Sequence, residues 1–441
     1  MLTAYRQKLA EIDPLKSIGR VTRAIGLIIE SQGPAVSVGD LCYLASQAGQ
    51  TGPDDGRKTM LEVIGFKDDR VLLMPLGQMP PVRVGDTVIA AGKSGDIGVG
   101  DGLLGRTIDA LGRPLDGLGE IKTSLSYPLN RDATNPLSRE NIDTTLETGV
   151  RPIDGLLTVG AGQRIGIFGG SGVGKSTLLG MMAKRSAADI NVIALIGERG
   201  REVREFIENE LGEEGMKRSV VIVSTSDDSG LIRIRAALAA TAIAEYFKDC
   251  GANVLLIMDS VTRFCMAQRE IGLAAGEPPS SKGYTPSVFA LLPRLLERAG
   301  KFTDAGSITG FYTVLVEGDD MNEPIADAVR SILDGHIVLS RQLASQNHYP
   351  CIDILNSASR LFTTLTTQDH RAHAGDVREL IAAYQKAEDL INIGAYQMGS
   401  NRKIDLAIGR HEEILTFLKQ DSAEESHLSH SIEQLMNIKT I

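Results

Sequence analysis

The spacing of apolar residues changes several times along the chain, and each change predicts a different kind of structure. Within residues 1–20, four apolar residues fall on one face of a helix: Leu2, Tyr5, Leu9 and Ile12. Asp13-Pro14 then ends the pattern, because proline cannot continue a helix. We therefore expect a short amphipathic helix here, and its few basic residues favour a protein partner over a lipid surface.

From residue 21 to residue 91 the apolar residues form short β-type runs. These runs are 24–29, 60–66, 71–74 and 87–90. Turn pairs such as Gly33-Pro34 and Gly85-Asp86 lie between them. Evenly spaced short strands predict a small β-barrel domain.

Residues 92–364 are expected to form a second domain, which begins with a loop-rich connection as far as about residue 145. Apolar strand-like runs then alternate with helix-like segments, which predicts an α/β fold with a mostly parallel sheet. The expected strands are 165–168, 192–196, 220–223, 254–258, 308–316 and 337–339. Ligands of such sheets bind at the carboxyl ends of the strands.

Residues 365–441 have a helical pattern and are expected to form a small C-terminal domain. Apolar residues recur at helical spacing in Val377, Leu380, Ile381 and Tyr384. Further helical runs cover 414–418 and 433–438, with a loop expected at 421–430.

The run from Arg164 to Thr177, RIGIFGGSGVGKST, carries the strongest chemical signal. It contains G-x-x-x-x-G-K-[ST] between an apolar strand and a helix-forming run, which is the context that a phosphate-binding loop requires. Glycines allow backbone N–H groups to approach phosphate oxygens, and the helix N-terminus adds positive potential. Lys175 would neutralise the phosphates, and Ser176 would bind Mg²⁺. The expected nucleotide-binding residues here are Gly169, Gly170, Ser171, Gly172, Val173, Gly174, Lys175, Ser176 and Thr177.

Two carboxylates end other predicted strands. Asp259 follows the apolar run 254–258, where a second Mg²⁺ contact is expected. Glu198 follows 193–197 and could orient the attacking water during ATP hydrolysis. Glu198 also opens a run of Glu and Arg residues, so its spacing alone does not distinguish a catalytic carboxylate from a solvated charge cluster.

Two later residues could reach a bound nucleotide only across the fold. Arg360 has the planar donor group that suits a transition-state contact, from this chain or from a neighbouring subunit. A bare arginine is more often a surface or ion-pair residue. Tyr349 could stack on an adenine, although a single tyrosine is more often part of a core or rim.

Composition restricts the function classes. The net charge of −10, the pI near 5.4 and the absence of tryptophan argue against a broad nucleic-acid surface. The four cysteines are dispersed without metal-type spacing, and the sequence has no apolar run of 18 residues. We expect a cytoplasmic protein.

Several motifs together resemble the rotary ATPase α/β superfamily, and within it the type III secretion ATPases. They are 103–117, ETGVRPID at 147–154, the phosphate loop, GERGRE at 197–202, DSVTR at 259–263, AQREIGL at 267–273, GEPP at 276–279, KGY at 282–284 and 350–360. The flagellar export branch is more similar than the injectisome branch. This resemblance implies a RecA-like P-loop NTPase core with an N-terminal β-barrel and a C-terminal helical domain.

The resemblance also implies roles for individual residues. Glu198 matches the carboxylate that activates water, Arg199 a neighbour of the γ-phosphate, and Asp259 the Mg²⁺-organising aspartate. Tyr349 matches the aromatic residue that stacks on the adenine, and Tyr396 matches a residue that borders the adenine. Arg360 matches an arginine finger that is offered to the adjacent subunit. One departure is Cys351, where Ala or Ser is more usual, and we expect it to affect packing and not chemistry.

For function, the resemblance implies Mg²⁺-dependent ATP hydrolysis by a homohexameric ring at the inner face of the cell membrane. A stator-like protein would bind the N-terminal helix, a coiled-coil stalk protein would enter the ring, and residues 276–284 would line the pore. Export substrates, chaperones and a membrane export gate are further expected partners. The alternatives are an injectisome ATPase, a catalytic subunit of a proton-coupled rotary ATPase, an RNA-translocating ring and a non-hydrolysing scaffold. Glu198 disfavours the scaffold, because non-catalytic rotary subunits carry Gln there.

Overall fold

The computed structural model describes residues 17–45, 59–93, 95–131, 135–303 and 305–440. It contains two compact units. The first takes in residues up to Asp96 together with Asp227–Ile234 and Met266–Val288, and the second comprises the rest of the chain. Most of the helix expected at residues 1–20 lies outside the described residues, and its last three residues belong to a strand.

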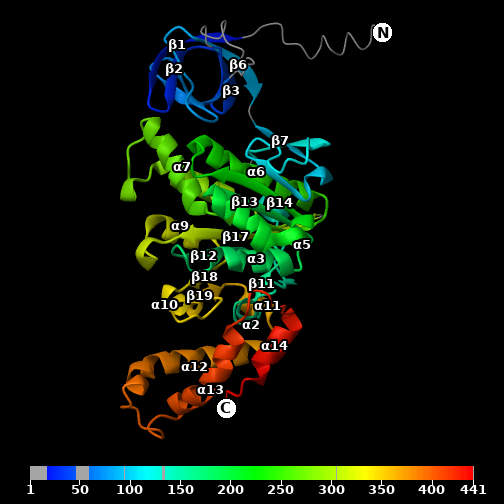
Figure 1. Ribbon diagram of the computed structural model, residues 1–441, viewed down its shortest axis with the longest axis vertical. Coiled ribbons are helices and arrows are strands. Elements are labelled where there is room, and N and C mark those ends of the chain that lie inside the picture. The colour runs from blue at the N-terminus through cyan, green and yellow to red at the C-terminus, as the bar shows by residue number, and fades with distance from the viewer. Residues whose placement is uncertain (1–16, 46–58, 94, 132–134, 304, 441) are drawn as a thin grey trace. The chain divides into compact units, whose positions relative to one another are not determined.

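The first unit contains the expected β-barrel, whose strands close in the order β1-β2-β5-β4-β3-β6 (Figure 1). All neighbouring strands are antiparallel. Their bounds are β1 (Ile18–Ile25), β2 (Ile28–Gln32), β3 (Asp40–Ala45), β4 (Thr59–Lys67), β5 (Arg70–Pro75) and β6 (Thr87–Lys93). Alternate residues, such as Leu61 and Val63 on β4, form its apolar core.

One detail of the predicted barrel was wrong. The run 24–29 is not one strand, because Gly26 and Leu27 form the two-residue turn between β1 and β2. Gly26 has φ +56°, a conformation that such tight hairpin turns require and that glycine adopts without strain.

The second unit contains a mixed but mostly parallel sheet in the order β19-β18-β12-β17-β15-β13-β14-β8. Only β18–β19 and the short pair β16–β17 are antiparallel among the described pairs of this sheet. The strands are β8 (Arg106–Asp109), β12 (Arg164–Gly169), β13 (Ile190–Glu198), β14 (Ser219–Thr225), β15 (Asn253–Asp259), β16 (Gly300–Lys301), β17 (Ser307–Leu315), β18 (Gly335–Leu339) and β19 (Ile352–Ser359). Small two-stranded sheets pair β7 (Asp96–Val99) with β9 (Leu125–Pro128) and β10 (Thr145–Leu146) with β11 (Val159–Gly160).

The predicted strands of this sheet are all present, but the edge strands β8 and β19 were missed. Central strands such as β13 and β15 are buried on both faces and therefore read as continuous apolar runs. At the edge, β19 buries only three of its eight residues, and β8 is only four residues long. Neither produces the apolar run on which the prediction depended.

Helices surround the sheet and form the C-terminal region. Their bounds are α2 (Arg151–Leu156), α3 (Lys175–Arg185), α4 (Gly200–Glu205), the π-helix η4 (Phe206–Leu211), α5 (Gly212–Lys217), α6 (Gly230–Asp249), α7 (Val261–Ala274), α8 (Pro286–Leu296), α9 (Pro324–Ile332), α10 (Arg341–Ser345), α11 (Phe362–Leu365), α12 (Gln368–Asn392), α13 (Arg402–Leu418) and α14 (Leu428–Asn437). Short 3₁₀ turns are η2 (Asp101–Leu103), η3 (Pro136–Ser138), η5 (Ser281–Gly283) and η6 (Glu317–Asp319).

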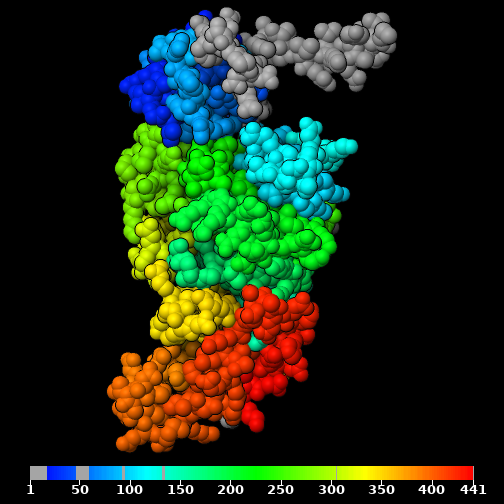
Figure 2. Space-filling model, viewed as in Figure 1, coloured from blue at the N-terminus to red at the C-terminus, as the bar shows by residue number. Residues whose placement is uncertain are grey.

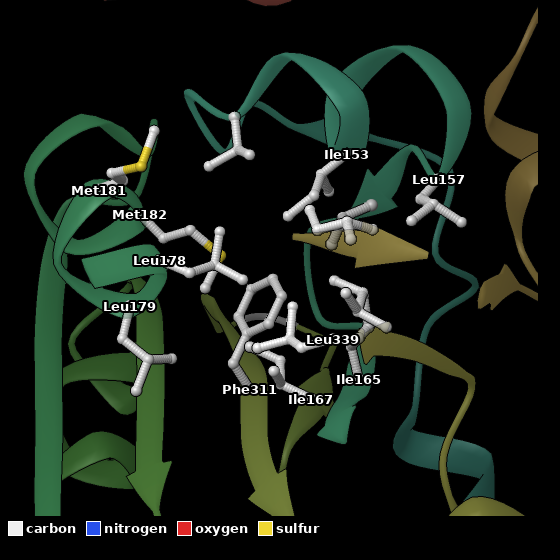
Figure 3. Packing of buried hydrophobic residues seen from close by; sticks show 14 of the residues in the cluster. Ile153, Leu157, Ile165, Ile167, Leu178, Leu179, Met181, Met182, Phe311 and Leu339 are labelled. Atoms are coloured by element: carbon white, nitrogen blue, oxygen red, sulfur yellow. The ribbon is translucent and has the colours of Figure 1, made fainter. Parts of the chain in front are cut away.

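The core of the second unit anchors the helix that follows the phosphate loop. Figure 3 shows Leu178 and Met182 of α3 pointing toward Phe311, Ile167 and Leu339 of the sheet. Leu179 and Met181 of the same helix are also buried in this core. Burial of each such side chain stabilises the fold by about 1.5–3 kcal/mol. The start of α3 is therefore fixed relative to the strand ends.

The C-terminal helices are present where the sequence predicts them, and α12 and α13 pack against each other (orange in Figures 1 and 2). The predicted loop at 421–430 is shorter, since α14 begins at Leu428. The ETGVRPID motif ties this region to the nucleotide domain. Arg151 donates from Nη1 to the carbonyls of Thr416 and Lys419 at the end of α13, at 3.1 and 3.3 Å. Those carbonyls have no partner within the helix, so Arg151 caps it.

Candidate active site

The phosphate loop connects β12 to α3 as the sequence predicts. Gly172 and Gly174 have φ angles of +79° and +77°, which non-glycine residues rarely adopt. Helix α3 begins at Lys175, so Lys175 and Ser176 lie in its first turn. The free N–H groups of that turn make the loop an anion-binding site.

A cleft of about 410 Å³ opens beside this loop. It brings together ten of the predicted site residues, which are Gly170, Ser171, Gly172, Gly174, Lys175, Ser176, Thr177, Glu198, Arg199 and Asp259. The rest of its lining is Arg201, Glu202, Glu205, Phe206, Glu210, Arg263 and Leu315. Gly169 and Val173 are not part of the lining, because Gly169 ends β12 and the Val173 side chain belongs to the core.

Asp259 lies at the base of the cleft and is almost fully buried. Its Oδ1 lies 3.6 Å from the Lys175 Nζ and accepts a hydrogen bond of 2.6 Å from the Thr313 hydroxyl. Because a buried charge is costly unless it is paired, these two contacts account for the carboxylate at this position. Thr313 was not predicted from the sequence.

Glu198, at the end of β13, has a perturbed acidity. Burial of its side chain, the nearby Asp259 charge and a hydrogen bond with Glu202 raise its pKa to about 7, while Lys175 and Arg263 act in the opposite direction. A carboxyl group that titrates near neutral pH can accept a proton from water. Glu198 lines the cleft and is only partly exposed, whereas the adjacent Arg199 is exposed.

Two of the three arginines that line the cleft, Arg199 and Arg263, differ in their contacts. Arg199 is largely exposed and lies 3.4 Å from Glu202. Arg263 is part of the DSVTR motif, and no role was predicted for it. Its side chain packs close to Gly197. Its buried Nε has no hydrogen-bond partner within the described part of the chain. Arg263 therefore retains an unused donor at the wall of the cleft.

Two other lining residues are fixed by local contacts. The Thr177 hydroxyl, expected to help bind the cofactor, donates to Glu210 on η4 at 2.8 Å. The π-helix therefore packs against the phosphate-loop helix, and such bulges are frequent at functional sites.

Tyr349 lies beside the loop, outside the phosphate cleft. A Cβ placed on Gly174 would lie 3.4 Å from its ring, and 43% of the residue is exposed. An exposed ring face next to the loop can stack on a base. The neighbouring Cys351 is buried, and its thiol donates to the Val173 carbonyl at 2.8 Å. We expected Cys351 to affect packing, and the segment that it contacts is the phosphate loop.

Arg360 does not reach the cleft of its own chain. It is exposed at the end of β19, where its Nη2 donates to the Arg330 carbonyl at 3.2 Å. Tyr396 is also absent from the lining, and its hydroxyl is hydrogen-bonded to Asp405 at 2.8 Å. The structure therefore brings together all the predicted catalytic residues except Arg360.

The oxygen atoms in the cleft suit Mg²⁺. Ser176 offers a hydroxyl and Asp259 a carboxylate, both of which are hard ligands. Among the described residues, no group of three or more His, Cys, Asp or Glu could hold a metal ion. Mg²⁺ is usually bound by one or two protein groups together with substrate phosphates, so this donor set fits the ion when a nucleotide is present.

The fold and this site agree with the protein families that the chain matches. Residues 149–359 match the nucleotide-binding domain of the ATP synthase alpha/beta family, and residues 21–92 match the beta-barrel domain of that family. Residues 366–437 match the C-terminal domain described as T3SS EscN ATPase. The helices found among the described residues are all too short or too polar to cross a membrane.

Similar proteins cover nearly the whole chain. A flagellum-specific ATP synthase of Bacillus subtilis is 56% identical over 432 residues, which are 97% of this chain and 96% of the relative. The assembled ATPase EscN of the enteropathogenic E. coli type III secretion system has a TM-score of 0.89 and 46% identity, covering 95% and 99% of the two chains. EscN in complex with its central stalk EscO has a TM-score of 0.86 at 45% identity and the same coverage.

The chain belongs to the ATP synthase alpha/beta family. Within that family it is an ATPase of the type III secretion branch, which includes the flagellum-specific enzymes.

Proposed function

We propose that this chain hydrolyses MgATP to drive or regulate protein export by a flagellar type III secretion apparatus. The observation that carries this proposal is a complete phosphate loop whose cleft also holds Glu198 and Asp259, in a chain 56% identical to a flagellum-specific ATP synthase. The matched T3SS C-terminal domain favours export over a proton-coupled rotary enzyme.

Each predicted site residue has a proposed role. The phosphate loop and Lys175 bind the β- and γ-phosphates, while Ser176 and Asp259 hold Mg²⁺, which supplies charge neutralisation when it is bound. Glu198 accepts a proton from the attacking water. Arg199 contacts the γ-phosphate region, and Tyr349 stacks on the adenine. Arg360 is the finger that completes the site of an adjacent subunit.

The proposed assembly follows from these roles and from the relatives. Arg360 does not line the cleft of its own chain, and EscN has been solved as an assembled ATPase and with a central stalk protein. We therefore infer a homohexameric ring around a coiled-coil stalk, in the cytoplasm at the inner face of the membrane. Export substrates, chaperones, a membrane export gate and a stator-like protein that binds the N-terminal residues complete the proposed set of partners.

The proposed role of Glu198 predicts a pH dependence. Its raised pKa of about 7 means that the carboxyl group becomes protonated as the pH falls below neutrality. A protonated group cannot act as a base, so we expect kcat/KM to fall about tenfold per pH unit below pH 7 and to level off above it. Arg263 lowers this pKa, so Arg263→Gln should move the midpoint upward.

The pH experiment compares kcat/KM of the two proteins from pH 5.5 to 8.5 at saturating Mg²⁺. Titration of ATP is common to both, so a difference in midpoint belongs to the enzyme. Equal midpoints, or full activity in the wild type at pH 5.5, would contradict this assignment of the base.

The proposed ring predicts that activity depends on protein concentration. If each site needs Arg360 from a neighbour, specific ATPase activity should rise steeply as particles of six chains appear. The measurement is ATPase activity against protein concentration, with mass photometry of the same samples in Mg-ATP. Lys175→Ala should be inactive at every concentration, which excludes a contaminating ATPase. Constant specific activity from a monomer would refute the interface site.

A further inference from the structure

Thr313 lies on the strand between the phosphate-loop strand and the strand that ends at Asp259. It belongs to β17, which separates β12 from β15. Thr313 is paired with Ile167 of β12, while the preceding Tyr312 is paired with Met258 of β15. The register therefore brings Thr313 level with Asp259, at the carboxyl ends of parallel strands.

The Thr313 hydroxyl makes a short hydrogen bond at a buried position. Its Oγ1 lies 2.6 Å from Asp259 Oδ1 and 3.4 Å from the Met258 carbonyl. Thr313 is fully buried, and Asp259 is 4% exposed. A hydroxyl has one proton to donate, and a separation of 2.6 Å is typical of a charge-assisted bond to a carboxylate. Asp259 is therefore the principal acceptor.

Lys175 and Thr313 contact the same carboxylate oxygen in different ways. The Lys175 Nζ is 3.6 Å from Oδ1, which is an ion pair beyond the usual hydrogen-bond distance. The side chain of Lys175 is long and mobile about several bonds, and its proposed partners are the phosphates of the nucleotide. Thr313 has few allowed χ1 rotamers because its side chain is β-branched, and its complete burial restricts rotation about χ1 further.

We propose that Thr313 is a positioning residue that keeps the Asp259 carboxylate oriented when a nucleotide draws Lys175 away. This inference rests on the proposed roles of Lys175 and Asp259. With Thr313 in place, Asp259 presents its other oxygen to the Mg²⁺ site without reorientation. Thr313 thereby couples the binding of Mg²⁺ to the binding of nucleotide.

The test measures that coupling directly. The affinity of a fluorescent, non-hydrolysable ATP analogue is determined with Mg²⁺ and in EDTA, and the ratio of the two dissociation constants is compared between variants of the full chain. Thr313→Val removes the hydroxyl and keeps the branched shape, while Thr313→Ser keeps the hydroxyl. Asp259→Asn tests the underlying role of the aspartate. Melting temperature and particle mass are recorded for each variant.

We expect Thr313→Val to reduce the Mg²⁺ effect on affinity about tenfold, which corresponds to about 1.4 kcal/mol. That loss lies near the range for hydrogen bonds to charged groups. Affinity in EDTA should be unchanged, and Thr313→Ser should retain the wild-type ratio.

Other outcomes would overturn the inference in distinguishable ways. If Thr313→Val and Thr313→Ser weaken binding equally in EDTA and in Mg²⁺, Thr313 has only a structural role. If Asp259→Asn reduces the ratio but Thr313→Val does not, Asp259 keeps its proposed function and Thr313 loses its own. If Asp259→Asn also leaves the ratio unchanged, the proposed role of Asp259 fails and this inference fails with it.

Discussion

Replacement of Glu198 by Gln is expected to lower kcat for ATP hydrolysis by about 10³-fold, within the range for loss of a general base. Glutamine has nearly the same shape as glutamate and can still hydrogen-bond water, but its neutral amide does not accept the proton. The cleft should otherwise remain intact, because Lys175, Asp259 and Thr313 keep their contacts. Nucleotide affinity should therefore change little.

The effects of Glu198→Gln on hydrolysis and on nucleotide binding are separated by two measurements on the same preparations. These are single-turnover hydrolysis and the affinity for a fluorescent nucleotide. Lys175→Ala is the matched comparison, since loss of the phosphate-binding charge should weaken binding as well as turnover. Undiminished turnover in Glu198→Gln would mean that another group activates the water. Near-normal turnover in Lys175→Ala would remove the basis of the proposed function.

The elements that could be predicted are those in which burial follows one regular pattern along the whole strand or helix. Strands buried on both faces, such as β13 and β15, read as apolar runs, and α12 shows the helical spacing of Val377, Leu380 and Ile381. The edge strand β19 does not have this signal, because only Ile352, Ile354 and Ser357 of its eight residues are buried. The turn at Gly26 was missed for a related reason, since the apolar residues on both sides of it continue without a break.

The site was predictable where one local motif specifies the chemistry. The glycine loop fixes its own backbone, so Lys175 and Ser176 could be assigned from sequence. Thr313 could not be assigned in this way, because its contact with Asp259 joins residues 54 positions apart on neighbouring strands. The strand order β12-β17-β15 creates this contact, and no spacing in the sequence reveals it. Arg263 was quoted within a motif, but only its buried, unpaired Nε reveals an available donor.

Arg360→Ala is expected to lower kcat by about 10³-fold or more, which is the effect of an arginine finger on phosphoryl transfer. Within its own chain Arg360 is exposed and donates a hydrogen bond to the Arg330 carbonyl, so its removal should not disturb the cleft. Nucleotide affinity and melting temperature should stay close to those of the wild type. An exposed arginine without a catalytic contact would change activity only slightly when replaced.

Mixed rings test whether Arg360 acts across the interface between subunits. Arg360→Ala chains keep Glu198, and Glu198→Gln chains keep Arg360. An interface is therefore complete when an Arg360→Ala chain supplies the cleft and a Glu198→Gln chain supplies the arginine finger. Random mixing at equal amounts should restore about a quarter of wild-type activity if the sites act independently. A chain with both substitutions, mixed with Glu198→Gln, forms no complete interface and should stay inactive. If Arg360→Ala and Glu198→Gln chains form mixed rings that are inactive at every ratio, Arg360 does not serve the neighbouring site, and a finger within the same chain would have to be sought.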